Sequence, residues 1–321
     1  MFKLIDIDLQ LFAGELNTQT TATGTLSPEM KTFYSDYLID NAVPKLVHDQ
    51  FGQKHPIPKN GGKTIEFRKY SPLPKLLTAL TEGVTPDGQS LTVTTITATV
   101  AQYGGYVTLS DMLMLTAIDN NMVQATKLLG AQAGATLDTI TREVLNGGTN
   151  VVYAGGVESR GAVTGNLTVD DIKKAVRALK TQNAEKIGDS FVAIIHPDVT
   201  YDLTNDPAWQ AVKDYDPKDW YEGEIGKIAG VRFVETTEAK IFEGGVYSTL
   251  ILGDNAYGVT EIEGGGLEHI VKQLGSAGTA DALNQRATVG WKATKVAERL
   301  VEQFMVRIES KSSFSDEVAT N

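Results

Sequence analysis

The 321-residue sequence contains no cysteine, which excludes disulfide bonds, thiolate metal sites and thiol catalysis. It has no run of 18 apolar residues, so no membrane-spanning helix is expected. The apolar start of the chain is interrupted by Asp6 and Asp8, and no signal-peptide cleavage motif follows. We therefore expect neither a secretory signal nor a membrane anchor.

Positive charge is also scarce. Lys and Arg number 29 against 40 Asp and Glu, which gives a net charge of −11. Broad nucleic-acid binding depends on clustered Lys and Arg side chains that neutralise phosphates. We therefore expect this chain to repel DNA over most of its surface and to read no base sequence.

Recognisable catalytic motifs are absent as well. There is no G-x-S-x-G, Walker A or H-E-x-x-H pattern, and the four histidines are not clustered. His196-Pro197-Asp198 could orient an imidazole or bind a metal, and an α/β enzyme that uses His196 and Asp198 stays open as an alternative. At the end of an apolar strand, however, this tripeptide is more typical of a strand-to-helix turn with Asp198 as the cap. We expect no catalytic, cofactor-binding or metal-binding residues.

The glycines of the stretch 223–238 precede an apolar strand. A dinucleotide fingerprint has the opposite order, because its glycines follow a strand and open a helix. We therefore predict a turn that leads into a strand at 231–235, with Gly226 and Gly230 supplying positive φ angles or close approach.

The first part of the chain, residues 1–55, predicts an apolar N-terminal arm and a short helix. Leucines and an isoleucine are scattered among polar residues before a Thr-rich linker, so the arm would need an outside surface to cover it. A disordered start over 1–25 is the alternative. Ser27-Pro28 then favours a helix that ends near residue 42.

Residues 56–110 predict a long two-stranded ribbon. Ile65 and Phe67 alternate with polar residues in the strand 63–70, and the stretch 90–111 is β-branched, with a change of phase at Thr94-Thr95 that suggests a bulge. The connection between the strands contains four leucines with no local core, and a two-stranded ribbon is marginal alone. We therefore expect the ribbon to lie on another subunit.

A long helix follows the ribbon. Apolar residues recur every three or four positions from Leu115 to Val144, and Asn146-Gly147-Gly148 is a stop signal. The pattern predicts one helix of about 30 residues, roughly 45 Å long. Two helices broken near Gly130 or Gly134 are the alternative.

Residues 165–285 predict a compact α/β domain. Thr168 opens a helix, 190–198 is a short buried strand, two short helices follow, and further strands lie at 231–238 and 247–262. We expect the stretch 286–310 to be mainly extended with a turn around 294–298, or partly helical in its middle. Residues 311–321 form a polar tail.

This order of features resembles the major capsid proteins of tailed bacteriophages, which have the Hong Kong 97-type fold, and the likeness covers nearly the whole chain. Within that group the chain looks most like the podophage N-four-type major capsid family. The stretches that carry the resemblance are LQLFA at 9–13, the ribbon from GGKTIEFRKY to TLSD at 61–111, HPD at 196–198, IGKIAGVRFVETTE at 225–238 and TVGWKATKVAERLVEQFMVRIES at 288–310.

The resemblance implies an α+β fold with an N-terminal arm, an extended β-ribbon loop, a long spine helix and a compact α/β axial domain. The implied domains are the arm and short helix at 1–55, the extended loop at 56–110, a peripheral domain at 111–164 and 286–310, the axial domain at 165–285 and a tail at 311–321.

The resemblance further implies a protein that is not an enzyme and has no cofactor. It would assemble into hexamers and pentamers of an icosahedral head around double-stranded DNA, in the virion after assembly in the host cytoplasm. Portal, scaffolding and decoration proteins are the expected partners, with any scaffold a separate protein. A nanocompartment shell is the alternative within the fold. Some relatives crosslink through Lys, but Lys69 and Lys75 have no identifiable Asn partner here, so crosslinking is not carried over.

We expect the subunit interfaces to involve the arm, the ribbon and two further positions. These residues are Leu9, Leu11, Phe12, Phe67, Lys69, Tyr70, Leu73, Leu76, Leu77, Leu80, Arg142 and Gly226.

Overall fold

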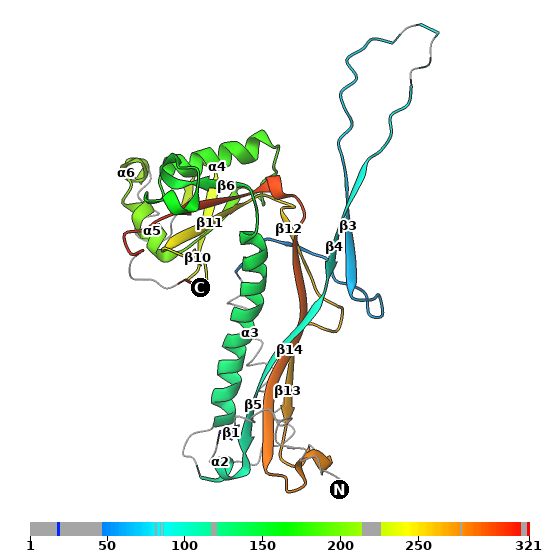
Figure 1. Cartoon of the computed structure of the whole chain (residues 1–321), viewed down its shortest axis with the longest axis vertical. Coiled ribbons are helices and arrows are strands. Elements are labelled where there is room, and N and C mark those ends of the chain that lie inside the picture. The colour runs from blue at the N-terminus through cyan, green and yellow to red at the C-terminus, as the bar shows by residue number, and fades with distance from the viewer. Residues whose placement is uncertain are drawn as a thin grey trace, which may run out of the picture. The chain divides into compact units, whose positions relative to one another are not determined.

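The computed structural model describes residues 18–19, 47–80, 82–83, 85, 87–116, 121–213, 226–276, 278–315 and 320–321 (Figure 1). The predicted arm and the predicted helix that starts at Ser27 lie outside the described residues, apart from Thr18–Gln19. The chain forms two compact units. Unit 1 comprises Met1–Val47, Gln102–Thr139 and Gly265–Thr294, and unit 2 comprises His48–Ala101, Ile140–Gly264 and Lys295–Asn321.

The described elements begin and end with runs of strands, and most of the helices lie between these runs. The helices are α2 (Asp111–Thr116), α3 (Asn121–Asn146), α4 (Val169–Thr181), α5 (Pro197–Thr204) and α6 (Pro207–Lys213), with short 3-10 turns between some elements. The strands are β1 (Thr18–Gln19), β2 (Gln53–Lys54), β3 (Thr64–Tyr70), β4 (Val93–Thr99), β5 (Ala101–Ser110), β6 (Val151–Tyr153), β7 (Phe191–Ile195), β8 (Lys227–Ile228), β9 (Val231–Glu235), β10 (Ile241–Phe242), β11 (Val246–Leu252), β12 (Tyr257–Thr260), β13 (Glu268–Lys272), β14 (Arg286–Arg299) and β15 (Met305–Ser310).

Unit 1 packs the first part of α3 against a sheet made by β1, β5, β13 and the first half of β14. Trp291 of β14 is buried and donates its indole N–H to Gln132 Oε1 of α3 over 3.1 Å. Glycine is needed where β5 and β14 meet, because a Cβ on Gly290 would lie 2.9 Å from the carbonyl oxygen of Gly105. The bare backbones therefore allow the two strands to approach closely.

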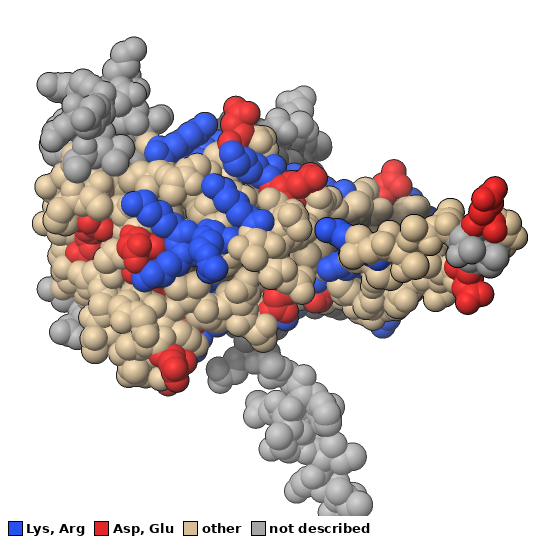
Figure 2. Space-filling model, turned by 90° about the horizontal axis from the view of Figure 1, so that it is seen from above, with Lys and Arg blue, Asp and Glu red and all other residues tan. Residues whose placement is uncertain are grey.

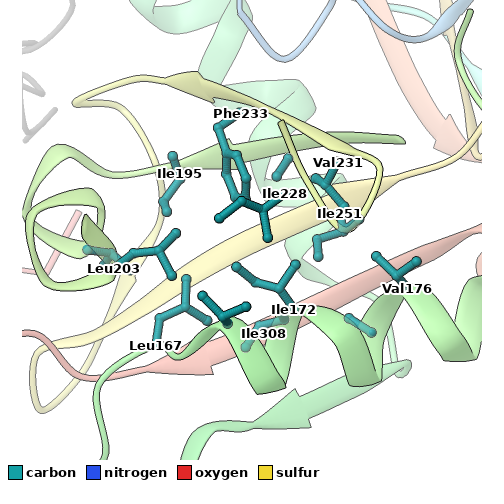
Figure 3. Close-up of a cluster of buried hydrophobic side chains, with 14 of the residues drawn as sticks. Leu167, Ile172, Val176, Ile195, Leu203, Ile228, Val231, Phe233, Ile251 and Ile308 are labelled. Carbon is teal, nitrogen blue, oxygen red and sulfur yellow. The ribbon is translucent and has the colours of Figure 1, made fainter. Parts of the chain in front are cut away.

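The main sheet of unit 2 has the strand order β6-β15-β11-β7-β9-β8, with β10 paired to β11. Its central strands β7, β11 and β15 are buried along their whole length. The helix α4 packs its apolar side against this sheet, and Figure 3 shows Ile172 and Val176 among side chains of the strands. This cluster is the hydrophobic core of unit 2.

Several expected elements of the α/β domain are confirmed. The side chain of Thr168 accepts the backbone N–H of Asp171 and caps α4, as predicted. The prediction that Asp198 caps α5 is wrong. At the start of this helix, His196 Nδ1 accepts a hydrogen bond from the backbone N–H of Asp198. Asp198 instead accepts a hydrogen bond from Tyr247 Oη at 2.6 Å.

The glycine-rich stretch ends in a tight hairpin between β8 and β9. Ile228 pairs with Val231, and the two residues between them, Ala229 and Gly230, have φ angles of 51° and 81°. Gly226 also has a positive φ, of 72°, so both predicted glycine conformations are confirmed. The positive φ of Ala229 was not foreseen, because alanine rarely adopts it.

The ribbon differs from its prediction in two respects. β3 and β4 pair without interruption from Thr64↔Thr99 to Tyr70↔Val93, so the expected bulge at Thr94-Thr95 is wrong. The expected single strand over 90–111 is two strands separated by Val100, and β5 pairs with β1 and β14 rather than with β3. The change of phase in the sequence means only that Val93 and Ile96 lie on opposite faces of β4.

The structure also corrects the predictions for the long helix and the C-terminal strand. α3 runs unbroken through Gly130 and Gly134, which excludes the predicted alternative of a break there, but it begins at Asn121 after the separate helix α2, with 117–120 outside the described residues. β14 continues to Arg299, so no turn occurs at 294–298. The interruption comes later, as a 3-10 turn at Glu302–Phe304.

Candidate subunit interface

The base of the ribbon is anchored in unit 2. Ala98 and Val100 are buried, and the rings of Phe67 and His55 meet edge to face with centroids 5.5 Å apart. A Cβ on Gly258 would lie 3.4 Å from Phe67 Cζ, so this glycine leaves room for the phenyl ring. The predicted interface residue Phe67 is therefore half-buried by its own chain.

Burial decreases along the ribbon from its base to its tip. On β3 the side chains of Ile65 and Phe67 are partly covered, while Glu66 and Arg68 are exposed. The last backbone hydrogen bond of the ladder joins Ser71 N–H to the carbonyl of Thr92 over 3.0 Å. None of the described residues between Ser71 and Thr92 lies in a regular strand or helix.

The tip exposes large apolar side chains. Leu77 is 89% exposed, Leu76 78% and Leu80 76%, while Leu73 and Tyr70 are 51% and 60% exposed. Lys69, which precedes Tyr70, is also exposed. A contiguous cluster of exposed apolar side chains of this kind marks an interaction surface. The structure thus brings the ribbon residues of the prediction together on one segment.

Sequence reasoning missed two members of this segment. Leu91 is 67% exposed and Val93 44%, on the returning side of the ribbon. The alternation of β-branched residues suggested a strand with one covered face, and no local signal distinguishes a face covered by the same chain from one left open.

The remaining predicted interface residues lie elsewhere. Leu9, Leu11 and Phe12 are outside the described residues. Gly226 is partly buried where the chain enters β8. Arg142 is only 4% exposed, and it donates to the carbonyl of Glu238 over 2.9 Å. This contact gives Arg142 a role within unit 2, and nothing in the structure tests its predicted role between subunits.

Charged networks hold the C-terminal end of α3 in unit 2. Arg142 and Lys240 both donate to Glu143 Oε1, at 2.9 Å each. Burial raises the pKa of Glu143, but the hydrogen bonds and charges of Lys240 and Arg142 outweigh it, so the pKa is lowered overall. The carboxylate therefore stays ionised and ties α3 to the segment before β10.

A second network is centred on a fully buried carboxylate. Glu309 of β15 is 0% exposed and accepts from Arg160 at 2.7 Å and from Arg307 at 2.8 Å. Arg307 also donates to the carbonyl of Asn146, the last residue of α3. The Arg160 guanidinium lies 3.5 Å above the ring of Phe242. Hydrogen bonding to Glu309 raises the pKa of Arg160, whereas burial lowers that of Arg307.

His196 and Asp198, the residues of the enzyme alternative, lie close together but do not form a recognisable cofactor site. His196 Nδ1 lies 3.3 Å from Asp198 Oδ2, and burial lowers the His196 pKa against the opposing charges of Asp198 and Glu235. The imidazole nitrogen that faces Asp198 already serves the helix cap. Over the described part of the chain no group of three or more His, Asp or Glu side chains could hold a metal ion. In that same part no helix is long and apolar enough to cross a membrane.

The comparison with protein families decides the classification. A family model described as phage capsid protein matches residues 93–301, which is about two thirds of the chain. This chain belongs to the phage capsid protein family. A comparison with curated proteins finds no match. The capsid protein is thus a structural protein of the phage head, a major capsid protein that forms the head shell from many copies and is located in the virion.

Solved structures of capsids share the fold. The chain is similar to the cyanophage Pam1 capsid subunit, with a TM-score of 0.64 and 16% identity over 85% of this chain and 92% of that one. For the Ralstonia phage GP4 capsid the TM-score is 0.62, with 14% identity over 83% and 88%. A virus-like particle from Pyrococcus furiosus gives 0.51, with 12% identity over 86% and 98%. These likenesses confirm the Hong Kong 97-type fold class, whereas the podophage subgroup stays a prediction.

Proposed function

We propose that this capsid protein assembles into hexamers and pentamers of an icosahedral head around double-stranded DNA, and that the ribbon tip is a main contact between neighbouring copies. The observation that carries the proposal is the exposure of Leu73, Leu76, Leu77 and Leu80 on a segment that its own chain leaves open. In a head-to-tail association each copy offers the same tip to the next, and such contacts close into rings.

The tip leucines supply a sizeable driving force. Burial of one leucine side chain stabilises a contact by about 1.5–3 kcal/mol before entropy costs. Each subunit would bury several such side chains and repeat the contact around every ring. Many moderate contacts then hold the shell together through multivalency.

Charge favours a second copy as the surface that receives the ribbon. The ribbon, residues 56–110, carries five Lys or Arg and three Asp or Glu, a net charge of +2, whereas the whole chain carries −11 and the remainder therefore −13. A basic ribbon is attracted to an acidic surface, and like-charged ribbons repel one another. The acidic body of a neighbouring copy provides such a surface.

Deletion of 72–88 tests this proposal. It leaves a three-residue loop between Ser71 and Thr92, whose backbone pair closes the ribbon, so the subunit should fold with unchanged circular dichroism. We expect a monomer in sedimentation and no particles in negative-stain images. Unchanged particles would show that the ribbon tip is not a main contact.

The other roles follow the same proposal. Residues 165–285 would be the axial domain around ring centres, and 111–164 with 286–310 the peripheral domain that contains α3. Portal, scaffolding and decoration proteins would be partners, and assembly would take place in the host cytoplasm. Co-purification of these proteins with immature particles would test the partners.

A nanocompartment shell is the second candidate, supported by the likeness to the Pyrococcus furiosus particle. That likeness shows the fold alone, and the family match favours a phage head. The contents of purified particles separate the two candidates, because a phage head holds DNA and a nanocompartment holds a protein cargo.

A further inference from the structure

One face of α4 carries a row of cations. Lys173, Arg177 and Lys180 are all exposed, and we call these three residues the α4 basic stripe. Successive members are about 6 Å and 4.5 Å apart along the helix axis, at 1.5 Å per residue. The apolar side of the same helix, including Ile172 and Leu179, is buried against the sheet of unit 2. The stripe therefore points away from the core of its own subunit.

The stripe lacks close acidic partners in the described part of the chain. The carboxylates of Asp170 and Asp171 lie 2.8 Å and 3.2 Å from Nζ of Lys174, which is not part of the stripe. Lys173 acts on Asp170 only through space, where it helps to lower the pKa of that carboxyl. No ion pair within 4.0 Å is found for the three stripe residues among the described side chains, and Figure 2 shows Lys and Arg gathered on the face that bears α4.

Such a row is unfavourable for the isolated subunit. Like charges three or four residues apart on a helix repel one another and destabilise it. The sequence keeps three of them in a chain with a net charge of −11. The row therefore points to an anionic partner outside the subunit.

We propose that the α4 basic stripe contacts the phosphate backbone of the DNA inside the head, an inference that rests on the proposed function. Duplex DNA presents one negative charge per about 1.7 Å of its axis, so a straight row of cations meets phosphates wherever it lies along the duplex. Three cations per subunit bind weakly and without regard to sequence. Without these three cations the chain has a net charge of −14 (−11 − 3), so the rest of the subunit repels DNA on average and the DNA can still move.

Unassembled full-length subunits and a fluorescent 30-base-pair duplex provide the first test. The variant Lys173→Gln/Arg177→Gln/Lys180→Gln keeps good helix formers and removes the three charges. Its slope of log affinity against log salt should be smaller by about 2.7, equal to about 40-fold between 50 and 200 mM salt. Its assembly into particles should be unchanged.

The matched control Lys54→Gln/Lys59→Gln/Lys63→Gln removes the same charge from exposed lysines elsewhere in unit 2 and should keep the wild-type slope. The subunit without 72–88 should also keep that slope, so failure of the ribbon proposal and failure of this one are distinguishable. An unchanged slope in the stripe variant, or loss of particles with unchanged DNA binding, overturns the proposal; the second result would assign the stripe to a contact between copies.

Acetylation of heads provides the second test, because it reports which side of the shell the stripe faces. Lys173 and Lys180 should be protected in DNA-filled heads and should react in emptied heads, as read by mass spectrometry. Equal reaction in the two kinds of head would refute contact with the enclosed DNA.

Discussion

Replacement of Glu309 by Gln is the sharpest test of how α3 is held in unit 2. The carboxylate is 0% exposed and lies between Arg160 and Arg307, and Arg307 also donates to the end of α3. Gln has the same shape and can still accept a hydrogen bond, but it carries no charge. The variant thus leaves the side chain of Arg307, 8% exposed, as a buried cation without its counter-ion.

The size of the effect follows from desolvation. Removal of one partner from a buried ion pair typically costs about 3–5 kcal/mol. Arg160 is 40% exposed and can regain water, so we expect the lower end, about 3 kcal/mol. A domain is stable by about 5–15 kcal/mol in total, so this loss is a large fraction of it.

Urea unfolding at a subunit concentration too low for assembly, followed by circular dichroism, measures this loss. Asp170→Asn is the control, because its pair with Lys174 has both side chains more than half exposed and its loss should change the stability little. If Glu309→Gln lost less than about 1 kcal/mol, the network would not be the desolvated anchor described above.

Three further predictions concern other parts of the chain. The variant Leu76→Ser/Leu77→Ser/Leu80→Ser should form no particles in electron microscopy, while its free energy of unfolding should change by less than about 0.5 kcal/mol. The control variant Leu76→Met/Leu77→Met/Leu80→Met keeps apolar side chains and should still assemble. Burial lowers the pKa of His196 below its usual 6.5, so between these two values the unfolded chain binds more protons and stability falls as pH falls. His196→Asn keeps a capping acceptor and should lose less stability than wild type between pH 7 and pH 5, and an equal loss would contradict the linkage. Ala229→Asn should raise the free energy of unfolding by up to about 1 kcal/mol, because asparagine tolerates the positive φ at this turn better than alanine. Urea titration measures the change, and a destabilised variant would contradict this reasoning.

Periodicity predicted much of the fold because it reflects burial within one chain. The stripe of α3, the alternation of Ile65 and Phe67 and the apolar run of β7 each correspond to a face that the structure covers. The glycines at 226 and 230 were also predictable, since their role follows from backbone conformation alone.

Boundaries and partners were less accessible to sequence reasoning. The end of the ribbon at Val100 depends on β5 pairing with β14, nearly 190 residues away in the sequence, and no local signal reports such a pairing. The cap at His196 was assigned to Asp198 because aspartate is the commoner capping residue, whereas Tyr247 holds Asp198 in the folded chain.

The candidate interface was predictable only in part. The leucines of the tip were noticeable because they lacked a local core, and the structure confirms that they are exposed. No pattern in the sequence supports an interface role for Arg142, and its hydrogen bond to the carbonyl of the distant Glu238 has no local signal. The surface that receives the ribbon lies on a second copy, so the sequence and structure of one chain do not identify it.

The joint at Val100 has a mechanical consequence. Only this residue separates β4 from β5, and it is itself buried. A connection of one residue has no slack, so tension applied by a neighbour to the ribbon would pass along the main chain into the strand that follows. Internal pressure on an assembled shell would then be carried first by covalent bonds and the hydrogen bonds between strands, and only afterwards by side-chain contacts.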